Sequence, residues 1–479
     1  MHPESRLHGA WLATRRHWLL AAVLALGLLA SCVGCASLPE LHEQAQAAPV
    51  ATPQMRGAHG VLPQAQRAAI LARLKRERGD IDILERHVAL EGALVGSPLV
   101  LGNRTTLLLD GPDTYAAMFK ALEGARDHIN LEVYIFEDDE MGRRFVDLLL
   151  AKQAEGVQVN ILYDSIGSLG TPAAFFDTLR QAGVRVLEFN PVNPLKVRKE
   201  WLLNNRDHRK LLIVDGQTAF LGGVNISHVY SSGSSFSRSR PKPAADGKPV
   251  TPWRDTHLQI DGPVVAEFQK AFLDTWQRQH GEPLPARNYF PGSPPRGNDL
   301  VRAVGSRAAD DHSLLYAALI SAIVSAERRV YVTNAYFVPD PQLVQALQDA
   351  ARRGVDVRLI LPGKTDSWIT YHAGRSHYAE LLEAGVKIYE RRHALLHAKT
   401  VMIDGVWSSV GSTNLDWRSF LHNDELDAIV LGAGFADRLK AAFLRDQAES
   451  QRIGAEEWAD RSPMLRIKEW SARLLEYWL

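Results

Sequence analysis

The chain has 479 residues, a length that suggests two or three domains, each with its own hydrophobic core. Of these residues 46% are hydrophobic and 23% are charged, a composition typical of a globular protein. Its 55 lysines and arginines balance 55 aspartates and glutamates, so it lacks the basic field that drives nonspecific binding to long nucleic acids. Nucleic acid is therefore not expected as a partner.

The N-terminus carries the pattern of an export signal. Arg15 and Arg16 precede a charge-free run from Trp18 to Ala30, which is too short for the roughly 20 residues of a membrane-spanning helix and suits a signal-peptide core. Small residues then lead to Cys32 and Cys35, the two cysteines of the chain, so neither a disulfide nor a thiolate metal site is expected in the remainder.

The residues before these cysteines resemble the lipobox of bacterial lipoproteins, in which the cysteine is lipidated and begins the mature chain. The resemblance implies lipidation at Cys32 or Cys35 and a protein anchored to a membrane of the bacterial cell envelope, on its periplasmic side. An uncleaved anchor helix and a cleaved signal without lipid remain the alternative interpretations.

Composition and turn residues divide the chain into segments. Ala, Pro, Gln and Gly without clear periodicity predict a tether after the signal, and a Gly/Pro-rich stretch from Gly281 to Gly297 predicts a domain boundary. A polar insertion from Ser231 to Thr251 predicts a mobile loop near the substrate entrance. The predicted organisation is a signal peptide with lipobox over 1–35, a tether over 36–75, a first domain over 76–282, a linker over 283–299, a second domain over 300–460 and an amphipathic C-terminal helix over 461–479.

The two predicted domains contain an internal repeat. Each has an apolar run, an amphipathic helical stretch and a second apolar run, a pattern that predicts a βαβ unit with parallel strands. These segments are Asn130–Phe136, Gly142–Gln153 and Gly156–Leu162 in the first copy, and Val330–Phe337, Pro341–Arg353 and Gly354–Ile360 in the second. The repeat predicts two duplicated α/β domains.

The C-terminal segment carries Ile467, Trp470, Leu474 and Trp478 at helical spacing, with charged residues between them. Two interpretations are equally compatible with this pattern. One is a helix docked on the protein core by its apolar side. The other is an interfacial helix that places its tryptophans at the depth of lipid headgroups.

Each copy also carries one polar motif, in which histidine, lysine, aspartate, a small residue and asparagine recur at identical spacing. The motif residues are His208, Lys210, Asp215, Gly223 and Asn225 in the first copy, and His397, Lys399, Asp404, Ser412 and Asn414 in the second. Residues i and i+2 of a strand share a face, so each histidine should emerge beside its lysine. Duplication makes this motif a much stronger signal than one H-x-K sequence.

The residue types in the motif suit phosphoryl chemistry. Lysines and asparagine amides, helped by Gly223 and Ser412, would hold an anion with several oxygens, and phosphate is the expected one. Histidine, with an ordinary pKa of about 6.5, can serve as a nucleophile or as a general acid and base. Asp215 and Asp404 belong to the predicted catalytic motif, but the Asp-Gly pair that each begins is a hairpin signal, which favours a structural role.

Metal binding is the main chemical alternative for paired histidines. The residue at +2 is a lysine in both copies, which is not a usual metal ligand and would repel a dication. No metal and no cofactor are therefore expected. A pair of structural histidines buried in strands is the other alternative, and the duplication of the whole motif disfavours it.

The two H-x-K-x4-D motifs, each followed by G-[GS]-x-N, resemble the signature of the phospholipase D superfamily, over about Val95 to Leu444. The resemblance is closest to bacterial cardiolipin synthases. It rests there on Tyr134–Phe136, Asn190-Pro191, Trp253–His257, Asp261–Pro263, Asn334–Pro339 and Asp416–Phe420. It implies two duplicated α/β domains, each a mixed sheet flanked by helices, related by a pseudo-twofold axis with one shared active-site cleft.

The family resemblance also implies roles for individual residues. His208 would form a covalent phosphohistidine and His397 would act as general acid and base, although the near-symmetry makes the assignment reversible. Asp255 and Glu425 resemble the family's later carboxylates, which orient the opposite histidines. Gly223 stands where the second copy has Ser412, so that hydroxyl is present once only.

The implied function is that of a membrane-associated phosphatidyltransferase of the cardiolipin synthase type. Its substrates would be phospholipids: phosphatidylglycerol, with phosphatidylethanolamine as a second possible donor. A phospholipase D hydrolase that yields phosphatidic acid is the alternative with the same chemistry. A non-catalytic, lipid-binding envelope protein is the alternative of another class.

Overall fold

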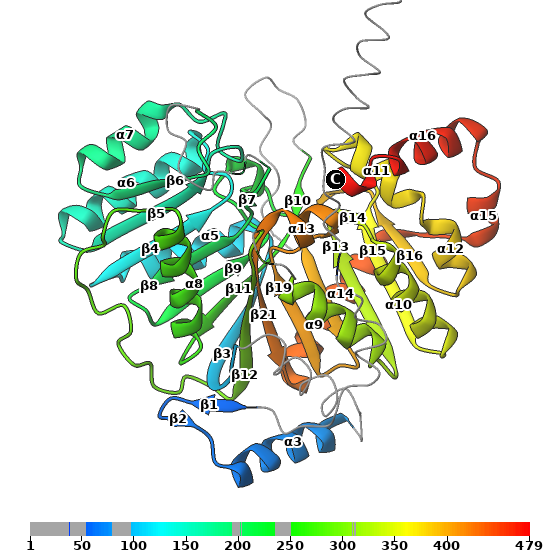
Figure 1. The fold of residues 1–479 in the computed structure, drawn as a ribbon, viewed down its shortest axis with the longest axis horizontal. Helices are drawn as coiled ribbons and strands as arrows, with labels where there is room; N and C mark the ends of the chain where they lie inside the picture. Colours follow the sequence, from blue (N-terminus) through cyan, green and yellow to red (C-terminus); the bar gives the residue numbers. More distant parts are fainter. Residues whose placement is uncertain are drawn as a thin grey trace, which may run out of the picture. The chain divides into compact units, whose positions relative to one another are not determined.

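The computed structural model describes residues 38, 54–78, 97–193, 202, 204–234, 251–308, 310 and 313–479, and residues 40–479 form one compact unit (Figure 1). The predicted signal peptide, with Cys32 and Cys35, lies outside the described residues, as does most of the predicted loop from Ser231 to Thr251. Within the described part of the chain, no helix combines the length and apolar character needed to cross a bilayer.

The described part of the predicted tether has regular structure. It contains β1 (Met55–Gly57), β2 (Gly60–Val61) and most of α3 (Gln64–Arg78). β1 pairs in parallel with a strand of the first copy, and its Met55 is fully buried. Because α3 is built largely from good helix formers, a helix forms without the apolar periodicity that the sequence prediction required.

The first copy of the repeat begins after these elements. Its elements are β3 (Leu99–Leu109), α5 (Asp110–Glu123), β4 (His128–Val133), α6 (Glu140–Ala154), β5 (Gln158–Asp164), α7 (Ala173–Gln181), β6 (Arg185–Phe189), β7 (Arg206–Asp207), β8 (Lys210–Val214), β9 (Thr218–Gly222), η3 (His228–Tyr230), β10 (Trp253–Arg254), β11 (Thr256–Asp261) and α8 (Val265–Arg278).

The second copy repeats this order and extends it. Its elements are β12 (Asp299–Ser306), α9 (Leu314–Val324), β13 (Arg329–Asn334), β14 (Phe337–Val338), α10 (Pro341–Arg352), β15 (Asp356–Pro362), α11 (Trp368–Arg375), α12 (Tyr378–Glu383), β16 (Lys387–Arg391), β17 (Leu395–Leu396), β18 (Lys399–Ile403), β19 (Trp407–Gly411), β20 (Leu415–Asp416), α13 (Trp417–Leu421), β21 (Asn423–Leu431), α14 (Ala433–Ala448), β22 (Ser450–Ile453), α15 (Ala455–Ala459), α16 (Pro463–Arg473) and η4 (Glu476–Trp478).

The βαβ units predicted from the repeat are confirmed. β4 pairs in parallel with β5, and β13 pairs in parallel with β15. The connecting helices begin where the sequence provides a cap, since Asp139 accepts from the amide of Gly142 and Asp340 accepts from the amide of Gln342. After each helix, Gly156 and Gly354 adopt the same positive φ of 91°, which turns the chain into the next strand.

The two copies have the same strand order and join edge to edge. Neighbouring strands run β6-β5-β4-β8-β9-β11-β3 in the first copy and β12-β21-β19-β18-β13-β15-β16 in the second. Antiparallel pairing of β3 with β12 connects them into one mixed sheet. The predicted fold class, two α/β copies with mixed sheets related by a pseudo-twofold axis, is confirmed.

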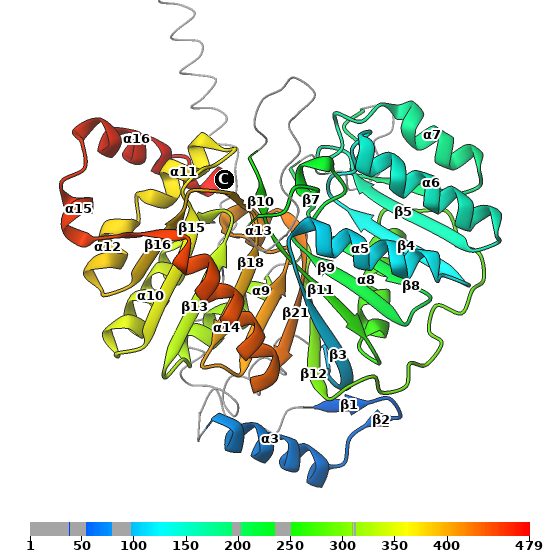
Figure 2. The ribbon, with the colours of Figure 1, turned by 180° about the vertical axis from the view of Figure 1, so that it is seen from behind.

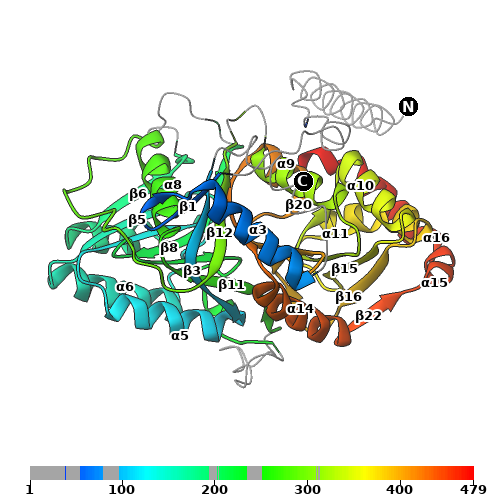
Figure 3. The same cartoon turned by 90° about the horizontal axis from the view of Figure 1, so that it is seen from below.

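Helices cover both faces of the joined sheet. One face carries α5 and α6 of the first copy with α14 of the second, and the other carries α8 of the first with α9 and α10 of the second (Figure 3). The reverse view shows α5, α6 and α14 on the same side (Figure 2). The main core crosses the join, because Phe268 and Phe272 of α8 and Phe435 and Phe443 of α14 belong to one buried cluster.

Candidate active site

Each H-x-K motif stands at the beginning of a β-hairpin. β8 starts at Lys210 and pairs with β9, and β18 starts at Lys399 and pairs with β19. His208 and His397 come two residues earlier, so they lie at the ends of the hairpins away from the turns.

Short strands of one copy pair with strands of the other copy and bring the two motifs together. β7 pairs in parallel with the beginning of β21, and β10 pairs in parallel with β17. The amide of His208 donates to the carbonyl of Asp424 at 3.0 Å, and the amide of His397 donates to the carbonyl of Arg254 at 2.8 Å. The chain segment that precedes β8 or β18 is thus held by the other copy.

This pairing gives each histidine a carboxylate from the opposite copy. Nδ1 of His208 lies 2.9 Å from Oε1 of Glu425, and Nδ1 of His397 lies 2.8 Å from Oδ2 of Asp255. All four side chains are buried. Because a carboxylate only accepts, these contacts favour the tautomers that leave Nε2 as the free ring nitrogen.

Both histidines line one cavity of about 390 Å³. Its wall contains Tyr134, Ile135, His208, Asn225, Tyr230, Trp253, Tyr336, Asp366, Ser367, Thr370, His397, Asn414, Asp416, Arg418, Asn423, Trp478 and Leu479. Aromatic rings surround the imidazoles: Tyr134 is 5.0 Å from His208, and Trp253 is 5.3 Å from His397, between ring centroids. The mixture of apolar and polar walls suits an amphipathic ligand.

The electrostatics of the cavity favour neutral histidines in the free protein. Burial, followed by the charges of Lys210 and Lys399, holds the pKa of His208 well below its ordinary value. Burial and Lys399 lower the pKa of His397 to about 4. A neutral imidazole has a lone pair to offer, so either ring can act as a nucleophile or accept a proton.

The two carboxylates differ in their own ionisation. Burial raises the pKa of Glu425 to about 7, although Lys210 acts in the opposite direction. Burial also acts to raise the pKa of Asp255, but His397 and Lys399 lower it below the ordinary value. His397 therefore has the fully ionised partner, which stabilises an imidazolium more strongly than a partly protonated glutamate does.

The two lysines are buried beside the histidines, and the charge of Lys399 affects the ionisation of Lys210. Burial, then Lys399, lowers the pKa of Lys210 to about 7, and burial lowers the pKa of Lys399 to about 8. Each ammonium donates to the carbonyl of its own motif histidine. Nζ of Lys210 also lies 5.2 Å from the ring centroid of Tyr134.

Of the six residues predicted to hold phosphate, only the two asparagines line this cavity, whereas Lys210 and Lys399 line the smaller cavities beneath it. Nδ2 of Asn225 donates to the hydroxyl of Tyr230 at 3.0 Å. Oδ1 of Asn414 is buried and has no hydrogen-bond partner within the described residues. Both asparagines lie on the wall of the cavity.

Gly223 and Ser412 lie behind the cavity rather than on its wall. The Ser412 hydroxyl donates to Glu425, and the amide of Gly223 donates to the carbonyl of Thr256. A Cβ atom on Gly223 would lie 2.1 Å from Oδ1 of Asp255. The structure thus brings Ser412 to Glu425 and Gly223 to Asp255, and the predicted contact of both residues with phosphate stays a prediction.

Asp215 and Asp404 lie at the far ends of their strands, in the hairpin turns. Both have a φ of 52°, and the glycine after each also has positive φ, so the predicted Asp-Gly turns are confirmed. The Asp215 carboxylate accepts from the amides of residues 126–128, and the Asp404 carboxylate accepts from those of 327–329. These aspartates do not reach the cavity, and their placement favours the structural role over the catalytic one.

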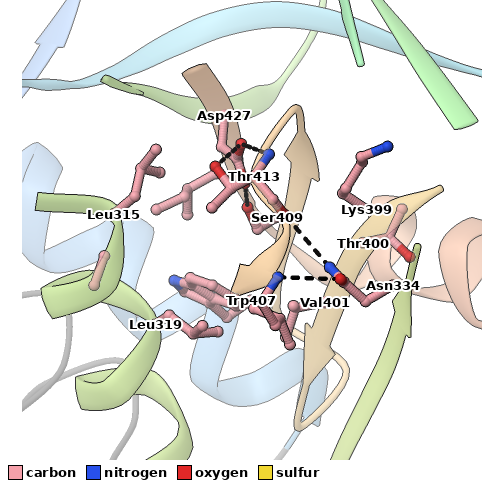
Figure 4. Close-up of a pocket in the computed structure, with 13 residues that line it drawn as sticks. Leu315, Leu319, Asn334, Lys399, Thr400, Val401, Trp407, Ser409, Thr413 and Asp427 are labelled. Carbon is pink, nitrogen blue, oxygen red and sulfur yellow. Dashed lines mark hydrogen bonds between the residues drawn. The ribbon is translucent and has the colours of Figure 1, made fainter. Parts of the chain in front are cut away.

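Two small internal cavities lie under the motifs and cannot hold a substrate. One, of about 20 Å³, is lined by Lys399, Trp407, Asp427 and neighbours, and Figure 4 shows Ser409 and Thr413 bonded to Asp427 beside it. The other, of about 10 Å³, lies under Lys210. Such volumes admit about one water molecule each.

Several residues of the cavity wall were not predicted as site residues. Arg418 is the main one: it contributes to lowering the pKa of His208 and donates to the Asn204 side chain at 3.0 Å. It lies in the segment Asp416–Phe420, in which the Asp416 side chain caps α13 by accepting from the amide of Ser419. Tyr336 likewise lies in the segment Asn334–Pro339 that supported the resemblance, whereas Tyr230 lacks a sequence signal of its own, because aromatic residues are common in apolar cores.

Comparison with known proteins finds similarity to cardiolipin synthases. A family model described as "Cardiolipin synthase, PLD-like domain" matches residues 118–233 and 319–447, which contain both motifs. The chain is 36% identical over 382 residues to a cardiolipin synthase of Geobacillus thermodenitrificans, covering 79% of this chain and 73% of that protein. It is also 36% identical over 382 residues to cardiolipin synthase A of Pseudomonas putida, covering 79% of this chain and 75% of the relative.

Solved structures support the fold. A phosphatidylserine synthase from Haemophilus influenzae superposes with a TM-score of 0.59, covering 82% of this chain and 100% of that one. The identity is 12%, so this likeness concerns the fold.

Proposed function

The chain belongs to the cardiolipin synthase family of phospholipase D-like proteins, and we propose that it joins two phosphatidylglycerol molecules into cardiolipin through a phosphohistidine on His208. It is a phosphatidyltransferase with phospholipid substrates, as this membership indicates. The observation that carries the proposal is the reciprocal pairing of His208 with Glu425 and His397 with Asp255 around one cavity.

In the first half-reaction, neutral Nε2 of His208 attacks phosphorus of one phosphatidylglycerol. The bond from phosphorus to the glycerol headgroup breaks, and the departing oxygen takes a proton from His397. The bound phosphodiester brings a negative charge that offsets Lys210 and Lys399, so binding favours the protonated form of His397. Ionised Asp255 favours it further.

In the second half-reaction, the headgroup hydroxyl of another phosphatidylglycerol attacks phosphorus. His397 takes the hydroxyl proton, the bond to His208 breaks, and cardiolipin leaves with neutral His208 restored. Lys210, Lys399 and the amides of Asn225 and Asn414 hold the phosphate oxygens in both steps. The net change is two phosphatidylglycerols to one cardiolipin and one glycerol.

The test is lipid mass spectrometry of purified protein with phosphatidylglycerol vesicles, alone and with phosphatidylethanolamine. Wild type should produce cardiolipin and glycerol, and His208→Ala and His397→Ala should not. An activated aryl phosphodiester, whose leaving group needs no proton, should phosphorylate His208 in the His397→Ala variant. Phosphatidic acid without cardiolipin would identify a hydrolase, and no turnover of any phosphodiester would leave the lipid-binding alternative.

The N-terminal lipobox supports a second, separate proposal: the chain is a lipoprotein held at an envelope membrane by Cys32 or Cys35. Incorporation of labelled fatty acid in cells should be lost when the modified cysteine alone is replaced by serine. Incorporation that survives the Cys32→Ser, Cys35→Ser double variant would contradict it, and unlabelled wild type would favour an unlipidated signal or anchor.

A further inference from the structure

Helix α16 is docked with its apolar side outward. Met464, Ile467, Trp470 and Leu474 share one face of the helix and are exposed, Ile467 by 57% and Trp470 by 63%. This outcome excludes a helix docked on the core by its apolar side, because the apolar stripe does not pack on the core.

Specific contacts hold the helix in this orientation. Its buried positions are Glu469 and Ala472. Glu469 forms ion pairs with Arg461 at 2.8 Å and with Arg375 of α11 at 3.8 Å, and Ala472 packs in a small cluster with Ala373. A buried, doubly paired glutamate fixes which side of α16 faces inward.

The neighbouring elements enlarge the exposed apolar surface. Trp368 and Ile369 of α11 are exposed, and so are Leu475 and Trp478 around η4. We define the apolar rim as the exposed side chains of α11, α16 and η4, namely Trp368, Ile369, Met464, Ile467, Trp470, Leu474, Leu475 and Trp478. α11 and α16 lie side by side in both ribbon views (Figures 1 and 2).

The apolar rim is continuous with the catalytic cavity. Ser367 and Thr370 of the α11 region and Trp478 and Leu479 beside η4 are part of the cavity wall. The carbonyl of Leu479 accepts from the amide of Arg418 at 3.0 Å, which connects the end of η4 to the cavity. A molecule seated on the rim would therefore lie at the mouth of the site.

The geometry points to a lipid bilayer as the occupant: we propose that the apolar rim inserts into the headgroup region of the membrane that supplies the substrate. The inference rests on the proposed function, because a diacyl phospholipid must pass from a bilayer into the cavity. Tryptophans favour headgroup depth, and Arg466 and Lys468 on α16 add positive charge that suits anionic phosphatidylglycerol. A second copy of the chain is the competing occupant.

A local probe tests the docking independently of catalysis and of the N-terminus. Cys32 and Cys35 are the two cysteines of the full chain, so replacing both with serine allows labelling at one new position. Ile467→Cys is the test site, and Phe290→Cys is the matched control. Phe290 is exposed, and its neighbours Tyr289 and Pro291 contact Gly216, which follows the end of β8 opposite Lys210. Each carries an environment-sensitive fluorophore.

On vesicles of phosphatidylglycerol and phosphatidylcholine, the label at 467 should shift to the blue and be quenched by spin-labelled lipid, whereas the label at 290 should not. No response at 467 would overturn the proposal. A blue shift at 467 that needs no vesicles and grows with protein concentration would overturn it in favour of a second copy.

Turnover gives a second readout. Ile467→Ser combined with Trp470→Ser should slow cardiolipin synthesis on vesicles by about tenfold or more while leaving turnover of monomeric short-chain phosphatidylglycerol within about twofold. Phe290→Ser should change neither rate. Equal rates of variant and wild type on vesicles would contradict the docking. A vesicle response at 467 without any turnover would reject the proposed function and retain the docking.

Discussion

Oδ2 of Asp255 in the first copy lies 2.8 Å from Nδ1 of His397 in the second copy, although 142 residues separate them in the chain. His208 and Glu425 repeat the relationship in the opposite direction. Each motif histidine therefore takes its carboxylate partner from the other copy, and both histidines line one cavity.

The two carboxylates should differ in importance. Asp255→Asn removes the ionised partner of His397 and should lower kcat by about 10³-fold or more with little change in KM. Burial raises the pKa of Glu425 to about 7, so below pH 7 its carboxyl is largely protonated and resembles glutamine. Glu425→Gln should therefore approach wild-type kcat at pH 6 and fall further behind at pH 8. Steady-state kinetics across this range measure both effects, and parallel losses at every pH would contradict the asymmetry.

Ser412 and Gly223 should not be exchangeable between the copies. Ser412→Gly removes one hydrogen bond to Glu425 and should reduce kcat by about tenfold. Gly223→Ser should be much more harmful, because its Cβ would lie 2.1 Å from Oδ1 of Asp255, which is already held by the amide of Thr256. Circular dichroism and kcat of the two folded variants test this order, and equal activities would refute it.

The sequence predicted the duplicated fold well because each copy repeats both its apolar periodicity and its turn residues. The pairing of His208 with Glu425 could not be predicted from sequence spacing, because it depends on the parallel pairing of β7 with β21. Only the family resemblance indicated it. The orientation of α16 was also undetermined. An amphipathic pattern predicts which residues share the apolar face of a helix and which share the polar face. In α16 the ion pairs of Glu469 determine which face is buried.

The turn aspartates should matter for stability and not for chemistry. Asp215→Ala removes the acceptor for three backbone amides and leaves an alanine at positive φ, so it should lower the free energy of unfolding by about 2–4 kcal/mol. Turnover per folded molecule should stay near wild type. Asp215→Asn is the control, because asparagine tolerates positive φ and retains an acceptor oxygen. Urea unfolding and active-site titration separate the two effects; a fall in turnover of fully folded Asp215→Asn would count against a structural role.

Chelation should leave the reaction intact. Nδ1 of each motif histidine faces a carboxylate, and the adjacent Lys210 and Lys399 would repel a dication from Nε2. We expect cardiolipin formation in EDTA at the rate without it, on vesicles whose aggregation is monitored by light scattering. If activity is lost in EDTA and returns on addition of Mg²⁺ or Zn²⁺, with unchanged scattering, the motif residues bind a metal ion and this prediction is wrong.

The lysines should impose an alkaline limit on substrate binding. Burial, then the neighbouring lysine charge, lowers the pKa of Lys210 to about 7, and burial lowers that of Lys399 to about 8. In the free enzyme both ammonium groups therefore lose their protons as pH rises through about 7 to 8, so attraction for the anionic phosphodiester declines over this range. We expect kcat/KM for phosphatidylglycerol to fall between pH 7 and pH 9 while kcat changes less, because bound phosphate favours the charged lysines. Lys210→Met should reduce kcat/KM at every pH and flatten part of this alkaline decline. A wild-type profile that is level up to pH 9 would mean that both lysines retain ordinary pKa values.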